Sequence, residues 1–197
     1  MNLFERRILL IIVSGILVLL VASPVLSRLL VFPRTEFFTE FWILDSNHGT
    51  KDYPLNVTLS HDYNVFLGIA NRLGHCAFYS VEVKFRNQTQ SAPNRFNHTS
   101  SSLPALFNIS AFVADEDVLE QSLTLSFVYQ YNESLSRVEF HSLELNGIKL
   151  DFHTMITGDK ENGFPGFLFF ELWIYNGTNS SFQYHDRFLS LRLNMTV

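Results

Sequence analysis

The sequence has almost no cysteine, so its stability cannot come from disulfide bonds. Cys76 is the single cysteine among 197 residues, and a lone thiol leaves no internal bridge to form. It lies in the segment HCAFYSVEV, beside apolar residues, and a free cysteine in such surroundings is most often a buried structural thiol. We therefore expect Cys76 to be buried. An intermolecular disulfide and a metal site shared with His75 are the alternatives.

The sequence also lacks the short motifs that mark common enzymes and cofactor sites. Its seven histidines are scattered without zinc-ligand spacing, and HExxH, GxSxG and phosphate-binding glycine loops are missing. Asp115–Asp117 is an acidic triplet without the spacing of a calcium loop, which favours a solvated turn. His185 and Asp186 are adjacent in a predicted strand, so their side chains should point to opposite faces. We predict no enzymatic activity, no cofactor and no metal.

Charged residues are few, at 17% of the chain, and basic residues are the minority. After residue 31 the sequence carries 11 basic and 18 acidic residues without a stripe of lysine and arginine. Nucleic-acid binding proteins gather basic residues on one face to contact phosphates. The charge pattern therefore predicts no nucleic-acid partner.

One long apolar run is present, Ile8–Ser27, with twenty residues and no charged side chain. As an α-helix it spans roughly 30 Å, the thickness of a bilayer core. We predict a transmembrane helix over residues 8–31, in contact with membrane lipid, after a short cytoplasmic head at residues 1–7. A cleaved signal peptide is the alternative. The length of the run and Pro24, directly after the best small-residue cleavage site, favour retention.

Acceptor triplets for N-linked glycosylation are unusually frequent after the apolar run. Chance gives about two Asn-x-Ser/Thr triplets for this composition, and none of those present has proline in the middle. Their number predicts N-linked glycans, which places the residues after the helix outside the cell and the N-terminus in the cytoplasm. The eight acceptor asparagines are Asn56, Asn87, Asn97, Asn108, Asn132, Asn176, Asn179 and Asn194.

Aromatic residues, 20 Phe and 7 Tyr among them, favour sheet over helix after the apolar run. Short alternating segments separated by turns are typical of an antiparallel immunoglobulin-like β-sandwich. We predict one all-β extracellular domain over residues 32–197, with two packed β modules at about 35–90 and 103–197 as the alternative. A long exposed loop is expected at 87–102. Strands are expected at 35–45, 53–60, 64–72, 75–86, 105–113, 122–131, 135–146, 147–155, 166–176 and 181–197.

The segment at residues 166–175 is apolar or aromatic on both faces, which predicts a central strand covered on both sides. The alternative is an exposed aromatic patch for a protein partner or self-association, because large uncovered apolar surfaces mark interaction sites. Its candidate residues are Phe167, Phe169, Trp173 and Tyr175. Trp42 and Trp173 are also candidate stacking platforms for a sugar.

Two blocks resemble a known family. The first contains Phe38–Leu44, Tyr53-Pro54 followed by Asn56, Gly68–Asn71 and Tyr79–Val83, and the second is the closing FFELWIYNGTNSSFQYHDRFLSLRLNMT. Together they resemble an uncharacterised, mainly archaeal membrane-protein family catalogued as domain of unknown function sixteen-sixteen. The resemblance implies an extracytoplasmic β-sandwich tethered to an archaeal membrane. It implies no catalytic residues and no ligand.

The sequence thus predicts a non-enzymatic, single-pass cell-surface glycoprotein with a structural or protein-interaction role, such as a subunit of an envelope or membrane assembly. A carbohydrate or small-ligand binding module is the first alternative. A surface hydrolase or metal-binding protein is the second.

Overall fold

The computed structural model describes residues 3–29, 36–94 and 96–197. The chain divides into two compact units, residues 1–36 and residues 37–197. The last two residues of the predicted transmembrane segment, 30 and 31, lie outside the described residues.

The first unit contains one helix, α1 (Leu3–Leu29). Its apolar side chains are exposed all around, from Phe4 to Val21. Residues Phe4–Ser23 are long and apolar enough to cross a membrane, and none of that stretch is buried. The helix continues past Pro24, which costs the backbone one hydrogen bond but does not end the helix.

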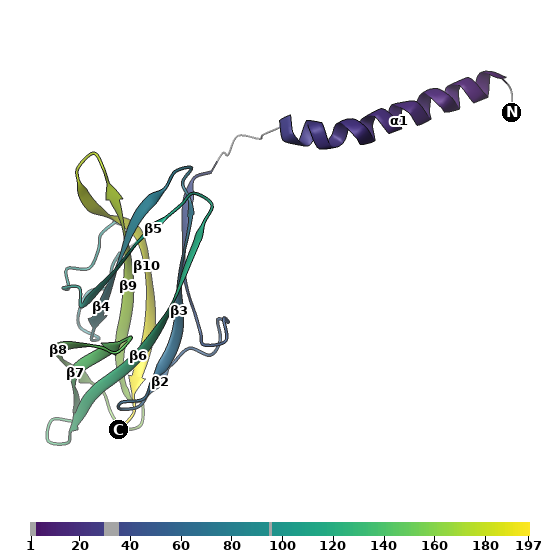
Figure 1. The fold of residues 1–197 in the computed structure, drawn as a ribbon. Coiled ribbons are helices and arrows are strands. Elements are labelled where there is room, and N and C mark those ends of the chain that lie inside the picture. The colour runs from purple at the N-terminus through teal and green to yellow at the C-terminus, as the bar shows by residue number, and fades with distance from the viewer. Residues whose placement is uncertain (1–2, 30–35, 95) are drawn as a thin grey trace. The chain divides into compact units, whose positions relative to one another are not determined.

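The second unit is a β-sandwich of two five-stranded sheets (Figure 1). We call the sheet with order β1-β3-β6-β7-β8 sheet A and the sheet with order β2-β10-β9-β4-β5 sheet B. All described pairings are antiparallel except the short β2–β10 pair. The strands are β1 (Phe38–Leu44), β2 (Asn56–Val57), β3 (Tyr63–Arg72), β4 (Ala77–Arg86), β5 (Phe107–Val113), β6 (Val118–Asn132), β7 (Arg137–Leu145), β8 (Ile148–Thr157), β9 (Phe164–Asn176) and β10 (Ser181–Met195).

The core lies between the two sheets and is built from alternate residues of each strand. Sheet A contributes Leu123, Leu125 and Phe127, and sheet B contributes Val81, Val83 and Phe85 among others. Phe140 is 1% exposed near the middle, with its ring centroid 4.6 Å from that of Phe85. The predicted β-sandwich is therefore confirmed, and so is the apolar helix before it.

The two-module alternative is wrong, and so are two of the expected strand boundaries. The two halves are not separate modules, because β3 pairs with β6, so early and late strands share sheet A. The strand expected at 53–60 shrinks to β2, and Leu55 and Leu59 on either side are exposed. Strand β6 begins at Val118, four residues before the strand that was expected at 122–131.

The strand order is immunoglobulin-like in part of each sheet. The order β4-β9-β10 corresponds to C-F-G, and the pair β1–β3 corresponds to A-B. The fold departs from that plan at β6–β8. There the inner strand β6 precedes its outer neighbour β7 in the chain, whereas in an immunoglobulin domain the outer strand comes first.

Cys76 is exposed, so the prediction of a buried thiol is wrong. It follows the β3–β4 turn, and the next residue, Ala77, points into the core with 5% of its surface exposed. Successive strand residues face opposite sides, so an inward Ala77 places Cys76 outward.

The loop after β1 is organised by one carboxylate. Asp45 is only 1% exposed. Its Oδ1 accepts hydrogen bonds from the backbone N–H groups of Asn47 at 2.8 Å and Gly49 at 2.9 Å. Its Oδ2 accepts from those of Lys51 at 3.1 Å and Asp52 at 2.9 Å. These bonds, led by those from Asp52 and Gly49, lower the pKa of Asp45 to about 2.

Replacing Asp45 by asparagine should reduce the acid sensitivity of folding. Because its folded pKa of about 2 lies below its ordinary 3.8, the carboxylate stabilises the fold above that ordinary value. This contribution is lost as the pH falls through the folded value. Urea midpoints at about pH 5 and about pH 2.5 should differ less in Asp45→Asn than in the wild type. The control Asp62→Asn, at an exposed aspartate, should keep the wild-type dependence; an unchanged dependence in Asp45→Asn would contradict the assignment.

Candidate interaction surface

The outer face of sheet B carries two rows of side chains that cross β5, β4, β9 and β10. The antiparallel register aligns these residues across the strands, all on the side opposite the core. The serine–aromatic row consists of Ser110, Ser80, Trp173 and Tyr184. The aromatic row, one step closer to the β9–β10 turn, consists of Phe112, Phe78, Tyr175 and Phe182.

The rings of the aromatic row touch one another. Phe78 stacks on Phe112 with centroids 4.2 Å apart and lies 5.2 Å from Phe182, which meets Tyr175 edge-on at 5.5 Å. The row is open to solvent, because Phe112 is 74% exposed, Tyr175 41% and Phe182 37%. The β9–β10 turn beside it lies at the end of the sandwich opposite the C-terminus (Figure 1).

The other half of the same face is covered by the segment 87–106. Glu171 of β9 is fully buried beneath it, and its Oε1 accepts a hydrogen bond from the backbone N–H of Ser101 at 2.6 Å. The Nζ of Lys84, 3% exposed, lies 2.7 Å from Glu171 Oε2 and 2.8 Å from Glu82 Oε2, and it donates to the Ser101 carbonyl at 3.2 Å. This buried ion pair fixes the segment onto the sheet. The loop that was expected to be exposed therefore covers part of the outer face of sheet B.

The predicted interaction residues divide between these two halves. Phe169 is 1% exposed, which excludes it as a docking residue. Phe167 is half-buried, with the Arg86 guanidinium 3.9 Å above its ring. Trp173 is half-buried and meets Tyr184 edge-on at 5.8 Å. Only the fourth candidate of that strand, Tyr175, belongs to the open aromatic row.

Trp42 lies on the outer face of sheet A, away from Trp173. Its indole covers Gly68, where a Cβ atom would be only 2.0 Å from the ring. Adding a side chain at residue 68 would therefore displace the indole. Because the two tryptophans occupy outer faces of different sheets, they do not form a single groove for a sugar.

Sequence reasoning missed three members of the aromatic row, Phe78, Phe112 and Phe182. A usable signal was present for two of them. Phe112 shares its strand face with Asn108 and Ser110, and Phe78 shares its face with charged residues of β4. A phenylalanine on an otherwise polar strand face indicates an exposed ring.

The acceptor asparagines form two groups. Asn56, Asn97, Asn108 and Asn179 are exposed. The other four are half-buried, and each donates a hydrogen bond through its Nδ2. The acceptors are the Met155 carbonyl for Asn87, Glu139 for Asn132, Gln183 for Asn176 and Asn56 Oδ1 for Asn194.

The His185–Asp186 pair does not form a catalytic dyad. A β-bulge interrupts the register between Tyr184 and Arg187, with Asp186 at φ 55°. His185 Nε2 lies 2.9 Å from Thr39 Oγ1, whereas Asp186 Oδ2 lies 2.9 Å from His98 Nδ1. Burial, and secondarily the Arg187 charge, lower the pKa of His185. Each residue thus serves a different structural contact.

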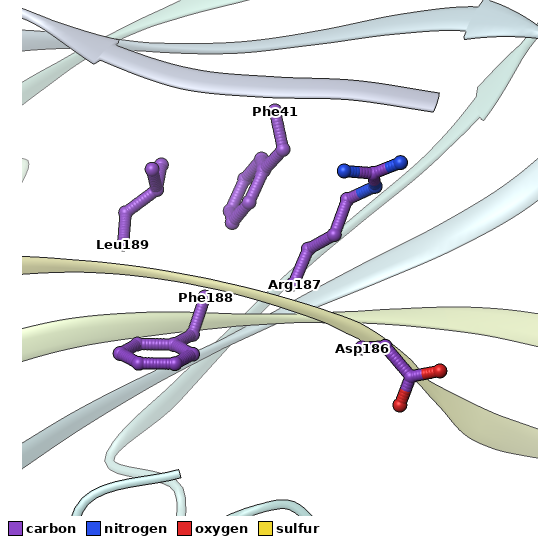
Figure 2. Close-up of a pocket in the computed structure, with 5 residues that line it drawn as sticks. All are labelled: Phe41, Asp186, Arg187, Phe188 and Leu189. Carbon is purple, nitrogen blue, oxygen red and sulfur yellow. The ribbon is translucent and has the colours of Figure 1, made fainter. Parts of the chain in front are cut away.

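A small pocket lies beside this bulge. It has a volume of about 150 Å³ and lies between β1 and β10. In Figure 2 the Phe41, Leu189 and Arg187 side chains lie between the two strands, whereas Phe188 and Asp186 point away. Its lining residues are the apolar Phe41, Phe188 and Leu189 together with Arg187 and Asp186. Among the described residues, no three histidine, cysteine, aspartate or glutamate side chains converge to hold a metal.

No family model and no curated protein matches the chain. Among solved structures, a chain from the complex of zinc 2-glycoprotein and prolactin inducible protein from human seminal plasma is similar, with 9% identity and a TM-score of 0.38. The match covers 83% of this chain and 98% of that one. A β-glucosidase from Listeria innocua matches with 10% identity and a TM-score of 0.38, over 81% of this chain and 16% of its own. The ASH/PapD-like domain of human CEP192 matches with 10% identity and a TM-score of 0.33, over 85% of this chain and 92% of its own. At these scores the matches carry no argument about function.

Proposed function

We propose that this chain is a non-enzymatic, single-pass membrane glycoprotein that holds a β-sandwich outside the cell for a structural or protein-interaction role. The observation that carries the proposal is α1. Its apolar side chains are exposed all around within the protein, and it forms a unit separate from a sandwich that has its own core. A helix that is apolar on every side requires an apolar environment, and the bilayer supplies one.

The orientation and setting follow from the sequence. The eight acceptor asparagines all lie after α1, which puts the sandwich outside the cell and the N-terminus in the cytoplasm. The family resemblance adds an archaeal cell surface as the setting. The open aromatic row supports a binding role for this face of the sandwich, because contiguous exposed apolar side chains mark contact sites.

A carbohydrate-binding module is the second candidate. Exposed rings lie next to the hydroxyl groups of Ser80 and Ser110. Aromatic rings and hydroxyl groups suit the apolar faces and the hydroxyl groups of a sugar.

The proposal that α1 is a membrane anchor predicts that α1 remains in the mature protein. The native protein should stay in the membrane fraction after high-salt and alkaline washes and be released by detergent, because the apolar helix is held by lipid. Mass spectrometry should find the peptides preceding Ile8 in the mature protein. An N-terminus that begins just after Ser23 would identify a signal peptide instead. Detergent-extracted protein that runs alone as a monomer would argue against an assembly subunit.

Glycan occupancy should follow exposure. We expect sugar on Asn56, Asn97, Asn108 and Asn179, and little or none on Asn87, Asn132, Asn176 and Asn194, whose Nδ2 atoms are engaged in the fold. Peptide mass spectrometry of the native protein before and after deglycosylation gives the occupancy of each site. Full occupancy of Asn194, which bonds to Asn56, would contradict this division, and an unchanged mass would refute glycosylation altogether.

A further inference from the structure

We propose that the oligosaccharide carried by Asn108 lies along β5 and packs its sugar rings against the aromatic row. The row is then a carbohydrate-binding platform that the chain occupies with its own glycan. This inference rests on the proposed glycosylation, and it assigns both a ligand class and an occupant to the open half of sheet B.

The attachment point and the platform share one strand face. Asn108, Ser110 and Phe112 are alternate residues of β5, and all three side chains are exposed on the outer side of sheet B. At ~3.3 Å per residue, Asn108 and Phe112 are about 13 Å apart, which a short oligosaccharide can span. A glycan on Asn108 therefore reaches the aromatic row without leaving the surface of the sheet.

The surface between Asn108 and Phe112 is formed by small polar side chains. Ser110 donates a hydrogen bond to Ser80 at 3.2 Å, and these two small side chains form the floor between Asn108 and Phe112. Their hydroxyl groups can donate to and accept from sugar hydroxyls. Across from Asn108, Glu82 offers a carboxylate acceptor. The polar side chains thus flank the path, and the rings stand at its end.

The glycan is favoured over a protein as the occupant because sequons border the row on two sides. Exposed Asn108 lies on β5, and exposed Asn179 lies in the β9–β10 turn beside Tyr175 and Phe182. Oligosaccharides at these positions would obstruct a second protein that approached the row. The same oligosaccharides would cover rings such as Phe112, which is 74% exposed in the bare chain.

The test is a double-mutant cycle on the full-length glycosylated protein in detergent, with thermal unfolding as the readout. Asn108→Gln removes the glycan and Phe112→Ser removes the outermost ring, and neither side chain is needed for the core. Each single change should lower the melting temperature by about 2–4 °C, and the double variant should fall no further than Phe112→Ser alone, which loses the stack on Phe78 as well as the glycan contact. As a matched control, Asn97→Gln removes another exposed glycan and should combine additively with Phe112→Ser. Dye binding to exposed apolar surface should rise in Asn108→Gln and fall back when Phe112→Ser is added.

Four results would overturn the inference. Additive effects of Asn108→Gln and Phe112→Ser, with Asn108 shown by mass to carry sugar, would refute glycan packing while leaving glycosylation intact. Sugar at other sequons but not at Asn108 would do the same. A concentration-dependent dimer of the glycosylated protein that Phe112→Ser abolishes would assign the row to a second copy of the chain. Absence of sugar from all eight sequons would refute the proposed glycosylation and this inference together.

Discussion

Replacing Lys84 by methionine is expected to destabilise the sandwich by about 3–5 kcal/mol, because it leaves a buried carboxylate without its cation. Glu171 is fully buried, and the Lys84 Nζ lies 2.7 Å from its Oε2. After the substitution, the backbone N–H of Ser101 still bonds to the Glu171 carboxylate. The loss should also free the segment 87–106, which the ion pair holds on sheet B.

Urea unfolding of the wild type and the variant measures the loss, and limited proteolysis within 87–106 reports on the release of the segment. The double variant Lys84→Met/Glu171→Leu should recover part of the stability, because it removes the unpaired Glu171 carboxylate as well as the Lys84 ammonium group. The control Lys149→Met breaks an exposed pair with Asp151 and should change stability by no more than about 0.5 kcal/mol. A loss below about 1 kcal/mol in Lys84→Met would show that the pair contributes little.

Replacing Asn71 by leucine is expected to cost on the order of 3 kcal/mol, because one buried side chain satisfies four polar groups of the fold. Asn71 is fully buried at the end of β3. Its Nδ2 donates to the carbonyls of His75 at 2.8 Å and Val113 at 2.9 Å. Its Oδ1 accepts from the Leu73 N–H at 3.1 Å and the Tyr79 hydroxyl at 3.3 Å.

Leucine is close to asparagine in size but bonds to none of these groups, so the variant isolates the polar contribution. Urea unfolding gives the loss, and faster hydrogen exchange at Leu73 should show that the β3–β4 turn has loosened. Asn64, which is exposed on the same strand, provides the control. Asn64→Leu should shift stability by no more than about 0.5 kcal/mol. Equal effects at the two positions would contradict the role assigned to Asn71.

The local features of this protein were predictable from the sequence because each depends on neighbouring residues. An apolar run without charge specifies a helix that needs an apolar environment, whatever the rest of the chain does. Alternation in segments such as Val81–Phe85 specifies a strand with one apolar face. Enough of these strands, separated by turns, specified a β-sandwich.

The candidate site depended on contacts that no local pattern contains. Lys84 and Glu171 are 87 residues apart, and only the pairing of β4 with β9 brings them together beneath the segment 87–106. For Cys76, the apolar neighbours suggested burial, but the start of β4 at Ala77 turned its side chain outward.

The sequence by itself determined the apolar helix, the strands and the positions of the sequons, since these follow from composition and period. Only the tertiary structure decided which aromatic side chains stay open to solvent. Phe169 and Tyr175 lie on the same face of β9, yet Phe169 is 1% exposed and Tyr175 is 41% exposed. Burial of a strand's second face depends on what packs over it, and that is set by long-range strand order and register.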